Sequence, residues 1–101
     1  MASARAPMLS QSDAEALIQR LAREQSRVVL ELPHAEDRMH KRGITVADVF
    51  KVLREGKVDR GPTRDTWGDT RYRLSGRAWE RTVRVVVALH GVERVFVVTV
   101  Y

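Results

Sequence analysis

Cysteine is absent from this sequence of 101 residues, and proline and aromatic residues are scarce. Without cysteine the chain can form neither a disulfide nor a thiolate metal site, and a reducing compartment is permitted. No apolar run approaches the roughly 20 residues that a membrane-spanning helix requires. The stretch from Met1 to Leu9 also lacks the apolar core of a secretion signal. These absences predict a cytoplasmic protein without a membrane segment.

The length predicts one domain with a small core. The hydrophobic fraction is 44% and the charged fraction is 31%, which suits a compact folded chain rather than a disordered one. We expect a flexible N-terminal tail over residues 1–11 and a single domain over residues 12–101.

Positive charge is concentrated in the second half of the chain. Residues 1–50 hold seven basic and seven acidic residues, whereas residues 51–101 hold eleven and six, so the second half supplies the net charge of +5. Fifteen of the eighteen basic residues are arginine. Because guanidinium groups bind phosphate in a planar fork and stack on bases, this half favours nucleic acid as a partner. A GC-rich genome would produce the same arginine bias.

Helical periodicity is confined to the first half. A capping-box pattern that begins at Ser12 predicts a helix over about 13–25. Residues 33–42 are predicted as a short helix that stops at Gly43, because glycine suits the left-handed position past a helix end. Residues 46–55 carry a wide apolar face and are predicted as the main core helix.

Alternating patterns follow from residue 57 onward. They predict strands over 57–60, 70–74, 81–89 and 92–101, separated by a loop over 61–69 that begins with Gly61-Pro62, a turn over 75–77 and a tight turn at His90-Gly91. Residues 27–32 are interpreted as an extended segment or an edge strand. We therefore expect an α+β fold, with N-terminal helices packed on one face of a four-stranded antiparallel sheet.

Strand parity predicts which side chains share each face of that sheet. The face against the helices should carry apolar side chains, namely Val83, Val85, Val87, Leu89, Val92, Phe96, Val98 and Val100. The open face should carry mostly polar side chains, namely Arg71, Arg73, Arg84, Thr99 and Tyr101. Three arginines and a tyrosine on an open sheet face suit RNA, although an ordinary solvated sheet face has a similar composition.

A second polar surface is predicted on the helix over 33–42. His34, Arg38 and Arg42 stand four residues apart in turn, so they share one face of that helix. A histidine can transfer a proton near neutral pH, and arginines can hold a phosphate. A solvated helix face has the same spacing.

No motif for metal, nucleotide-loop or serine-nucleophile chemistry is present. The histidines are not spaced as metal ligands, and the glycines lie at helix ends and turns. Metal-free cleavage of RNA needs only a general base, a general acid and a cation. His34 could be the base or the acid, Arg38 the cation, and Tyr101 the second proton carrier or a stacking platform. The side chains available to bind RNA are Arg42, Arg71, Arg73, Arg84 and Thr99.

One block of sequence resembles a known family. It reads His-Ala-Glu-Asp-Arg-Met-His-Lys-Arg-Gly-Ile from His34, and the chain ends in Val-Val-Thr-Val-Tyr. These residues are similar to a widespread bacterial family of small proteins labelled a domain of unknown function, with the pattern His-Ala-x-x-Arg-Met-x-x-Arg-Gly-Ile. The resemblance covers residues 28–101. The family in turn resembles the MqsR, BrnT and RelE-like toxins, whose helices precede an antiparallel sheet.

The resemblance implies a RelE-like or microbial-ribonuclease-like fold and the toxin of a bacterial type II toxin–antitoxin system. Such a toxin is a metal-independent endoribonuclease that acts without a cofactor on mRNA, free or on the ribosome, and is restrained by a cognate antitoxin protein. The family block contains His34, Arg38 and Arg42, and the terminal motif contains Thr99 and Tyr101. The lysine-rich sheet of several RelE-like toxins is replaced by arginines here. The alternative is a degenerate toxin relative, a non-catalytic basic module that binds RNA or an acidic protein.

Overall fold

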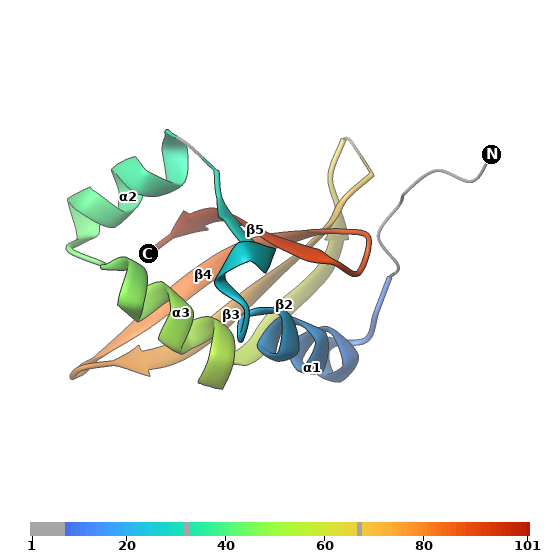
Figure 1. Ribbon diagram of the computed structural model, residues 1–101, viewed down its shortest axis with the longest axis horizontal. Coiled ribbons are helices and arrows are strands. Elements are labelled where there is room, and N and C mark those ends of the chain that lie inside the picture. The colour runs from blue at the N-terminus through green and yellow to red at the C-terminus, as the bar shows by residue number, and fades with distance from the viewer. Residues whose placement is uncertain (1–7, 32, 67) are drawn as a thin grey trace.

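The computed structural model describes residues 8–31, 33–66 and 68–101. The elements are, in order, α1 (Gln11–Leu21), a 3-10 turn (Gln25–Arg27), β1 (Val28–Leu30), α2 (His34–Arg42), α3 (Val46–Glu55), β2 (Lys57–Arg64), β3 (Thr70–Ala78), β4 (Arg81–His90) and β5 (Arg94–Val100). In these residues the strands form a five-stranded sheet in the order β1-β5-β4-β3-β2 (Figure 1). β1 runs parallel to β5, and the other neighbouring strands are antiparallel.

The α+β class is confirmed, but the prediction of a four-stranded antiparallel sheet is wrong. The additional strand is β1, which pairs with residues 95–97 of β5. It lies within the segment 27–32 that was interpreted as an extended segment or an edge strand, and it is an edge strand of the sheet. Leu32 of that segment is outside the described residues. Three residues are too few to show alternation, and a parallel pair leaves no hairpin signal in the sequence.

The hydrophobic core lies between one face of the sheet and helices α1 and α3 (Figure 1). β4 contributes the four side chains that were predicted to face the helices, Val83, Val85, Val87 and Leu89. α2 lies beside β5 and adds Ala35 and Met39 to the same core. None of the helices in the described residues combines the length and apolar character needed to cross a membrane.

Two helix ends match the sequence pattern and one does not. α1 begins after Ser10, whose hydroxyl accepts a hydrogen bond from a first-turn N–H, so the predicted cap at Ser12 and the helix over 13–25 are displaced. α3 spans Val46–Glu55, as predicted, and a capping box at Thr45 precedes it. α2 ends at Gly43, whose φ of 64° is the left-handed conformation expected for glycine there.

The residues just before α1 contact the sheet. Of the tail predicted over 1–11, residues 1–7 lie outside the described residues. The next ones are held near β3, where the Tyr72 hydroxyl donates to the Leu9 carbonyl at 2.7 Å. Tyr72 itself is 1% exposed, and burial raises the pKa of its phenol.

β2 is longer than the sequence indicated. It continues through Gly61-Pro62, where a break and a loop over 61–69 were predicted; Trp67 of that segment lies outside the described residues. β2 is an edge strand with two register shifts between Val58 and Thr63. An edge strand at a bulge does not need every backbone N–H in the ladder, so the proline is tolerated.

β3 also passes through a predicted turn, at residues 75–77. A Cβ on Gly76 would lie 3.3 Å from Val52 Cγ2 of α3, so glycine here allows the helix to approach the strand closely. β3 and β4 pair as far as Ala78 and Arg81, and the turn falls at Trp79-Glu80.

A bulge in β5 changes which side chains face the core. Val97 pairs with Val87, and Thr99 pairs with the preceding Val86, so Val98 is an extra residue in β5. The alternation of side chains therefore inverts at Val98.

The prediction that Phe96 faces the helices is wrong because of this bulge. Val95 and Val97 are fully buried before it, and Val100 is fully buried after it. Phe96 consequently lies on the open face. The prediction that Val92 faces the helices is also wrong, because Val92 precedes β5 and is 50% exposed. The inversion also brings Tyr101 to the open face, where the sequence placed it.

Candidate functional site

The polar residues that strand parity predicted on the open face of the sheet lie there together. Paired residues of neighbouring strands lie on the same face, so three rows cross it. The rows are Arg71, Ala88 and Phe96; Arg73, Val86 and Thr99; and Ser75, Arg84 and Tyr101. The shared placement of the three arginines, Thr99 and Tyr101 is therefore confirmed, and their role in binding RNA stays a prediction.

One end of this face holds an arginine–tyrosine cluster, which we define as Asp59, Arg73, Ser75, Arg84 and Tyr101. Arg73 donates to both carboxylate oxygens of Asp59, at 2.8 and 3.2 Å, and its third contact is to the Tyr101 hydroxyl at 3.3 Å. Ser75 also donates to Asp59. This network fixes the position of the tyrosine hydroxyl on the sheet.

Charges within the cluster support one another. The Arg73 guanidinium holds the pKa of Asp59 below its ordinary value, with a further contribution from Ser75. Asp59 and then Tyr101 raise the pKa of Arg73 above its ordinary value, so the guanidinium stays charged. The Arg84 guanidinium also contributes to the low pKa of Asp59 through its charge. Among the described residues, its side chain makes no hydrogen bond and no ion pair.

A small hollow of about 170 Å³ lies beside the cluster. Its lining comes from β2, β3, β4 and Tyr101: Arg60, Gly61, Thr63, Arg71, Tyr72, Arg73, Val86 and Tyr101. Arg71 also lines a larger hollow further along the same face, so this arginine stands between the two depressions.

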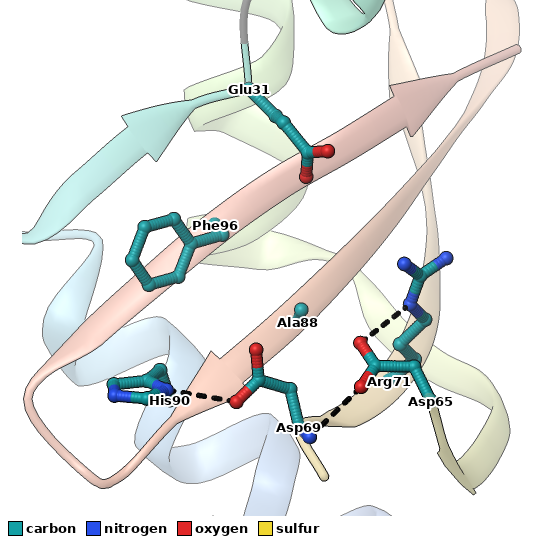
Figure 2. A pocket seen from close by; sticks show the side chains of 7 residues that line it. All are labelled: Glu31, Asp65, Asp69, Arg71, Ala88, His90 and Phe96. Carbon is teal, nitrogen blue, oxygen red and sulfur yellow. Dashed lines mark hydrogen bonds and ion pairs between the residues drawn. The ribbon is translucent and has the colours of Figure 1, made fainter. Parts of the chain in front are cut away.

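The larger depression, which we call the histidine hollow, has a volume of about 340 Å³. Figure 2 shows the seven residues that line it: Glu31, Asp65, Asp69, Arg71, Ala88, His90 and Phe96. Ala88 lies between the surrounding larger side chains, and Glu31 and His90 lie on opposite sides (Figure 2). Three carboxylates, one guanidinium and one imidazole thus surround one concave surface.

Hydrogen bonds orient the histidine. Nδ1 of His90 lies 2.8 Å from Oδ1 of Asp69, and the imidazole contacts the Phe96 ring edge-to-face with 6.4 Å between centroids. The Asp69 backbone N–H donates to Asp65, which is also paired with Arg71 at 3.3 Å. Because an ionised carboxylate only accepts, Nδ1 donates the hydrogen to Asp69 and Nε2 is left toward solvent.

The sequence analysis did not predict the histidine hollow. His90 was assigned to a turn, and the aspartates to a loop. Glu31, Asp69 and His90 come from three separate segments that only the sheet brings together, so no local spacing links them. Phe96 was assigned to the wrong face for the reason given above.

None of the α2 residues His34, Arg38 and Arg42 lines either hollow. His34 is an exposed residue at the start of α2, and the Arg42 carbonyl accepts a hydrogen bond from Arg81. Nε of Arg38 is buried and has no hydrogen-bond partner in the described part of the chain. Within the described residues, no hydrogen bond or ion pair joins His34 or Arg38 to Tyr101. The structure therefore does not unite the predicted catalytic residues through direct contacts.

The buried hydroxyl of Thr99 also has no partner among the described residues. In the same part of the chain, no group of three or more histidine, aspartate or glutamate side chains is arranged to hold a metal ion.

Comparison with known proteins gives one family match. Residues 32–101 match a family model whose description is a domain of unknown function (DUF4258). No curated protein and no solved structure matches the chain. The matched segment contains both the block at α2 and the terminal motif, and it covers more than half of the chain. The chain therefore belongs to the family described as a domain of unknown function (DUF4258).

Proposed function

We propose that this protein is a metal-independent endoribonuclease of the toxin type, which holds RNA on the open face of its sheet. The observation that carries the proposal is the row arrangement of that face, in which Arg71, Arg73 and Arg84 stand beside Tyr101. The opposite face is covered by helices and supplies the core. RNA would therefore meet the sheet on the arginine-bearing side.

The chemistry of the face suits a single strand of RNA. Arg84, whose guanidinium makes no hydrogen bond or ion pair within the described part of the chain, could bind a phosphate, whereas Arg73 holds the Tyr101 hydroxyl in place. Aromatic rings on such a surface can stack on bases, and Phe96 and Tyr101 lie on this face. A cation beside a positioned hydroxyl is also suited to stabilise the charge that develops on phosphorus during cleavage.

Cleavage of defined RNA tests the proposal. The purified protein should cut an oligoribonucleotide in the presence of EDTA, and a single 2′-deoxy substitution at the cut site should block cleavage there. Tyr101→Phe and Arg84→Ala should slow cleavage, whereas Arg20→Ala on the exposed side of α1 should not. Bound but intact RNA would instead favour the non-catalytic binding module.

Induced expression in a bacterial host tests the toxin role. Growth arrest with loss of cellular RNA is expected for the wild type, and co-expression of a cognate antitoxin should restore growth. The His34→Ala variant tests the residue that the family block suggests. Unimpaired growth together with abundant folded protein would contradict the toxin role.

A further inference from the structure

The small hollow beside the arginine–tyrosine cluster has a lining that suits an anion. Three guanidinium groups line it, those of Arg60, Arg71 and Arg73, and among the described residues no carboxylate does. Its volume of about 170 Å³ is below the roughly 300 Å³ of the smallest pockets that hold drug-sized molecules, so it suits one small group. We propose that this hollow binds one phosphate group of an RNA strand. The inference rests on the proposed function and gives one phosphate a defined place.

Two of these arginines stand directly opposite each other on neighbouring strands. The register of β2 and β3 pairs Arg60 with Arg73, and both side chains line the hollow. Like charges at paired positions of a sheet destabilise it. Asp59 compensates the charge of Arg73, whereas Arg60 makes no hydrogen bond or ion pair among the described residues. A bound phosphate would supply the negative charge that this pair of arginines lacks.

The arginines around the hollow retain hydrogen-bond donors for a ligand. A guanidinium has five N–H donors and no acceptor. Arg60 keeps all of its donors, and Arg71 donates to a carboxylate through Nε, which leaves its two terminal nitrogens. Arg73 donates once through Nε and once through each terminal nitrogen, so one N–H remains at each terminal nitrogen. Phosphate oxygens are the acceptors that match such forks.

The other polar groups of the lining also favour an acceptor-rich ligand. The Tyr101 oxygen accepts a hydrogen bond from Arg73 at 3.3 Å, so its own hydrogen can be donated to a phosphate oxygen. Thr63 adds an exposed hydroxyl. The carbonyl of Gly61 already accepts a hydrogen bond from the Gln11 side chain at 2.8 Å. The hollow therefore presents mainly donors and positive charge.

The position of the hollow suits a strand that continues along the open face. Arg84 lies in the adjoining row together with Tyr101, and Phe96 shares a row with Arg71, which lines both hollows. A phosphate in the small hollow would leave its neighbouring nucleotides near a second cation on one side and an aromatic ring on the other. An internal phosphate and a phosphate at the end of a strand share this chemistry, and the experiment distinguishes them.

Titration with inorganic phosphate tests the site without RNA. At constant ionic strength, phosphate should produce saturable shifts of the amide resonances of Arg60, Gly61, Thr63 and Tyr101 in isotope-labelled protein. Arg60→Gln should weaken this binding by about tenfold or more, since a charged hydrogen-bond donor is lost. Arg60→Lys keeps the charge without the planar fork and should weaken it less.

Arg77→Gln provides the matched control. Arg77 is an exposed residue of β3 that makes no hydrogen bond or ion pair among the described residues, and it does not line the hollow. Its replacement changes the net charge as Arg60→Gln does and should leave phosphate affinity within about twofold. Because Arg60 and Arg77 are both exposed, we expect an unchanged Tm in both variants.

Two oligoribonucleotides of one sequence identify the source of the phosphate. One begins with a 5′-hydroxyl and the other with a 5′-phosphate. Equal affinities, with inorganic phosphate competing against both strands, would assign the hollow to a backbone phosphate. Tighter binding of the 5′-phosphorylated strand would assign it to the 5′ end. In both cases Arg60→Gln should lower the RNA affinity and raise KM for cleavage while kcat changes little.

The outcomes separate this inference from the proposed function. Absence of saturable phosphate binding, or equal losses in R60Q and R77Q, would overturn the phosphate site and leave the proposed ribonuclease to its own test. Wild-type RNA affinity in R60Q would also overturn the site. Phosphate and RNA binding that R60Q weakens, in a protein that cuts no RNA, would support the phosphate site and overturn the proposed ribonuclease.

Discussion

The three arginines of the open face differ in how much of their hydrogen-bonding capacity is already used. Arg73 is bound to Asp59 and Tyr101, and Arg71 is bound to Asp65. Arg84 has no such partner among the described residues. A guanidinium that is already paired must share or lose its partner to bind phosphate, so the electrostatic contribution to RNA affinity should come mainly from Arg84.

Arg84→Ala should therefore weaken RNA binding more than removal of an equal charge elsewhere. We expect an affinity loss of about threefold to tenfold and a log–log salt slope smaller by about 0.7, since one phosphate contact is lost. Arg20→Ala changes the net charge equally but lies on the exposed side of α1. Titrations of labelled RNA at several salt concentrations measure both quantities. Equal losses in the two variants would contradict a localised contact.

The Asp59–Arg73 pair should make stability depend on pH. Because the Arg73 guanidinium lowers the pKa of Asp59 below its ordinary 3.8, the folded state binds this proton less readily than the unfolded state. The stabilisation is then complete above about pH 4 and is lost as the pH falls through the depressed pKa. Asp59→Asn should lower the Tm by a few degrees at pH 7. The difference should close near pH 2 in calorimetry, and a constant difference would contradict the prediction.

At the scale of elements, the turn between β3 and β4 carries an unusual residue. Trp79 has a φ of 60° and is 86% exposed, so a large side chain adopts a left-handed backbone with little burial in return. A left-handed conformation costs a non-glycine residue about 1–2 kcal/mol, although glycine has more entropy to lose on folding. The turn is thus less stable with tryptophan at this position than it would be with glycine.

Trp79→Gly should consequently stabilise the fold by about 0.5–1 kcal/mol. Gly43→Ala provides the opposite change at nearly the same φ, with open space around the added Cβ. It should destabilise the fold by about 1 kcal/mol. Denaturant unfolding of both variants measures these differences. Destabilisation by the glycine at position 79 would show that the tryptophan contributes packing that its exposure does not reveal.

Elements with local signals could be predicted, and elements that depend on distant contacts could not. α3 and the β4–β5 hairpin follow from periodicity and caps within a single stretch. β3 passes through Gly76 only because α3 approaches at that point, and β1 is a strand only because β5 lies beside it. The bulge at Val98 likewise reflects pairing with β4, which the alternation in β5 alone does not encode.

At the scale of the whole molecule, one end of the open face could be predicted from local sequence patterns, and the other end depends on distant contacts. Arg73 and Arg84 lie on adjacent strands with regular alternation, and Tyr101 follows the bulge in β5, so parity within each short stretch sufficed to group them. The histidine hollow needs Glu31 from the end of β1, Asp69 from the loop before β3 and His90 from the end of β4. Its assembly depends on the strand order, in which β1 lies next to β5, and the sequence did not indicate that order.

The two-faced sheet leads to a prediction about where RNA contacts the whole molecule. α1 and α3 cover one face, so a bound strand should lie across both hollows on the other. Titration of isotope-labelled protein with a short oligoribonucleotide should shift amide resonances of β3, β4 and Tyr101. Those of α1 should stay in place, and the shifts should shrink as salt rises. Shifts concentrated on α1 or on the outer side of α2 would place the RNA elsewhere, and the arginine-bearing face would then be an ordinary solvated surface.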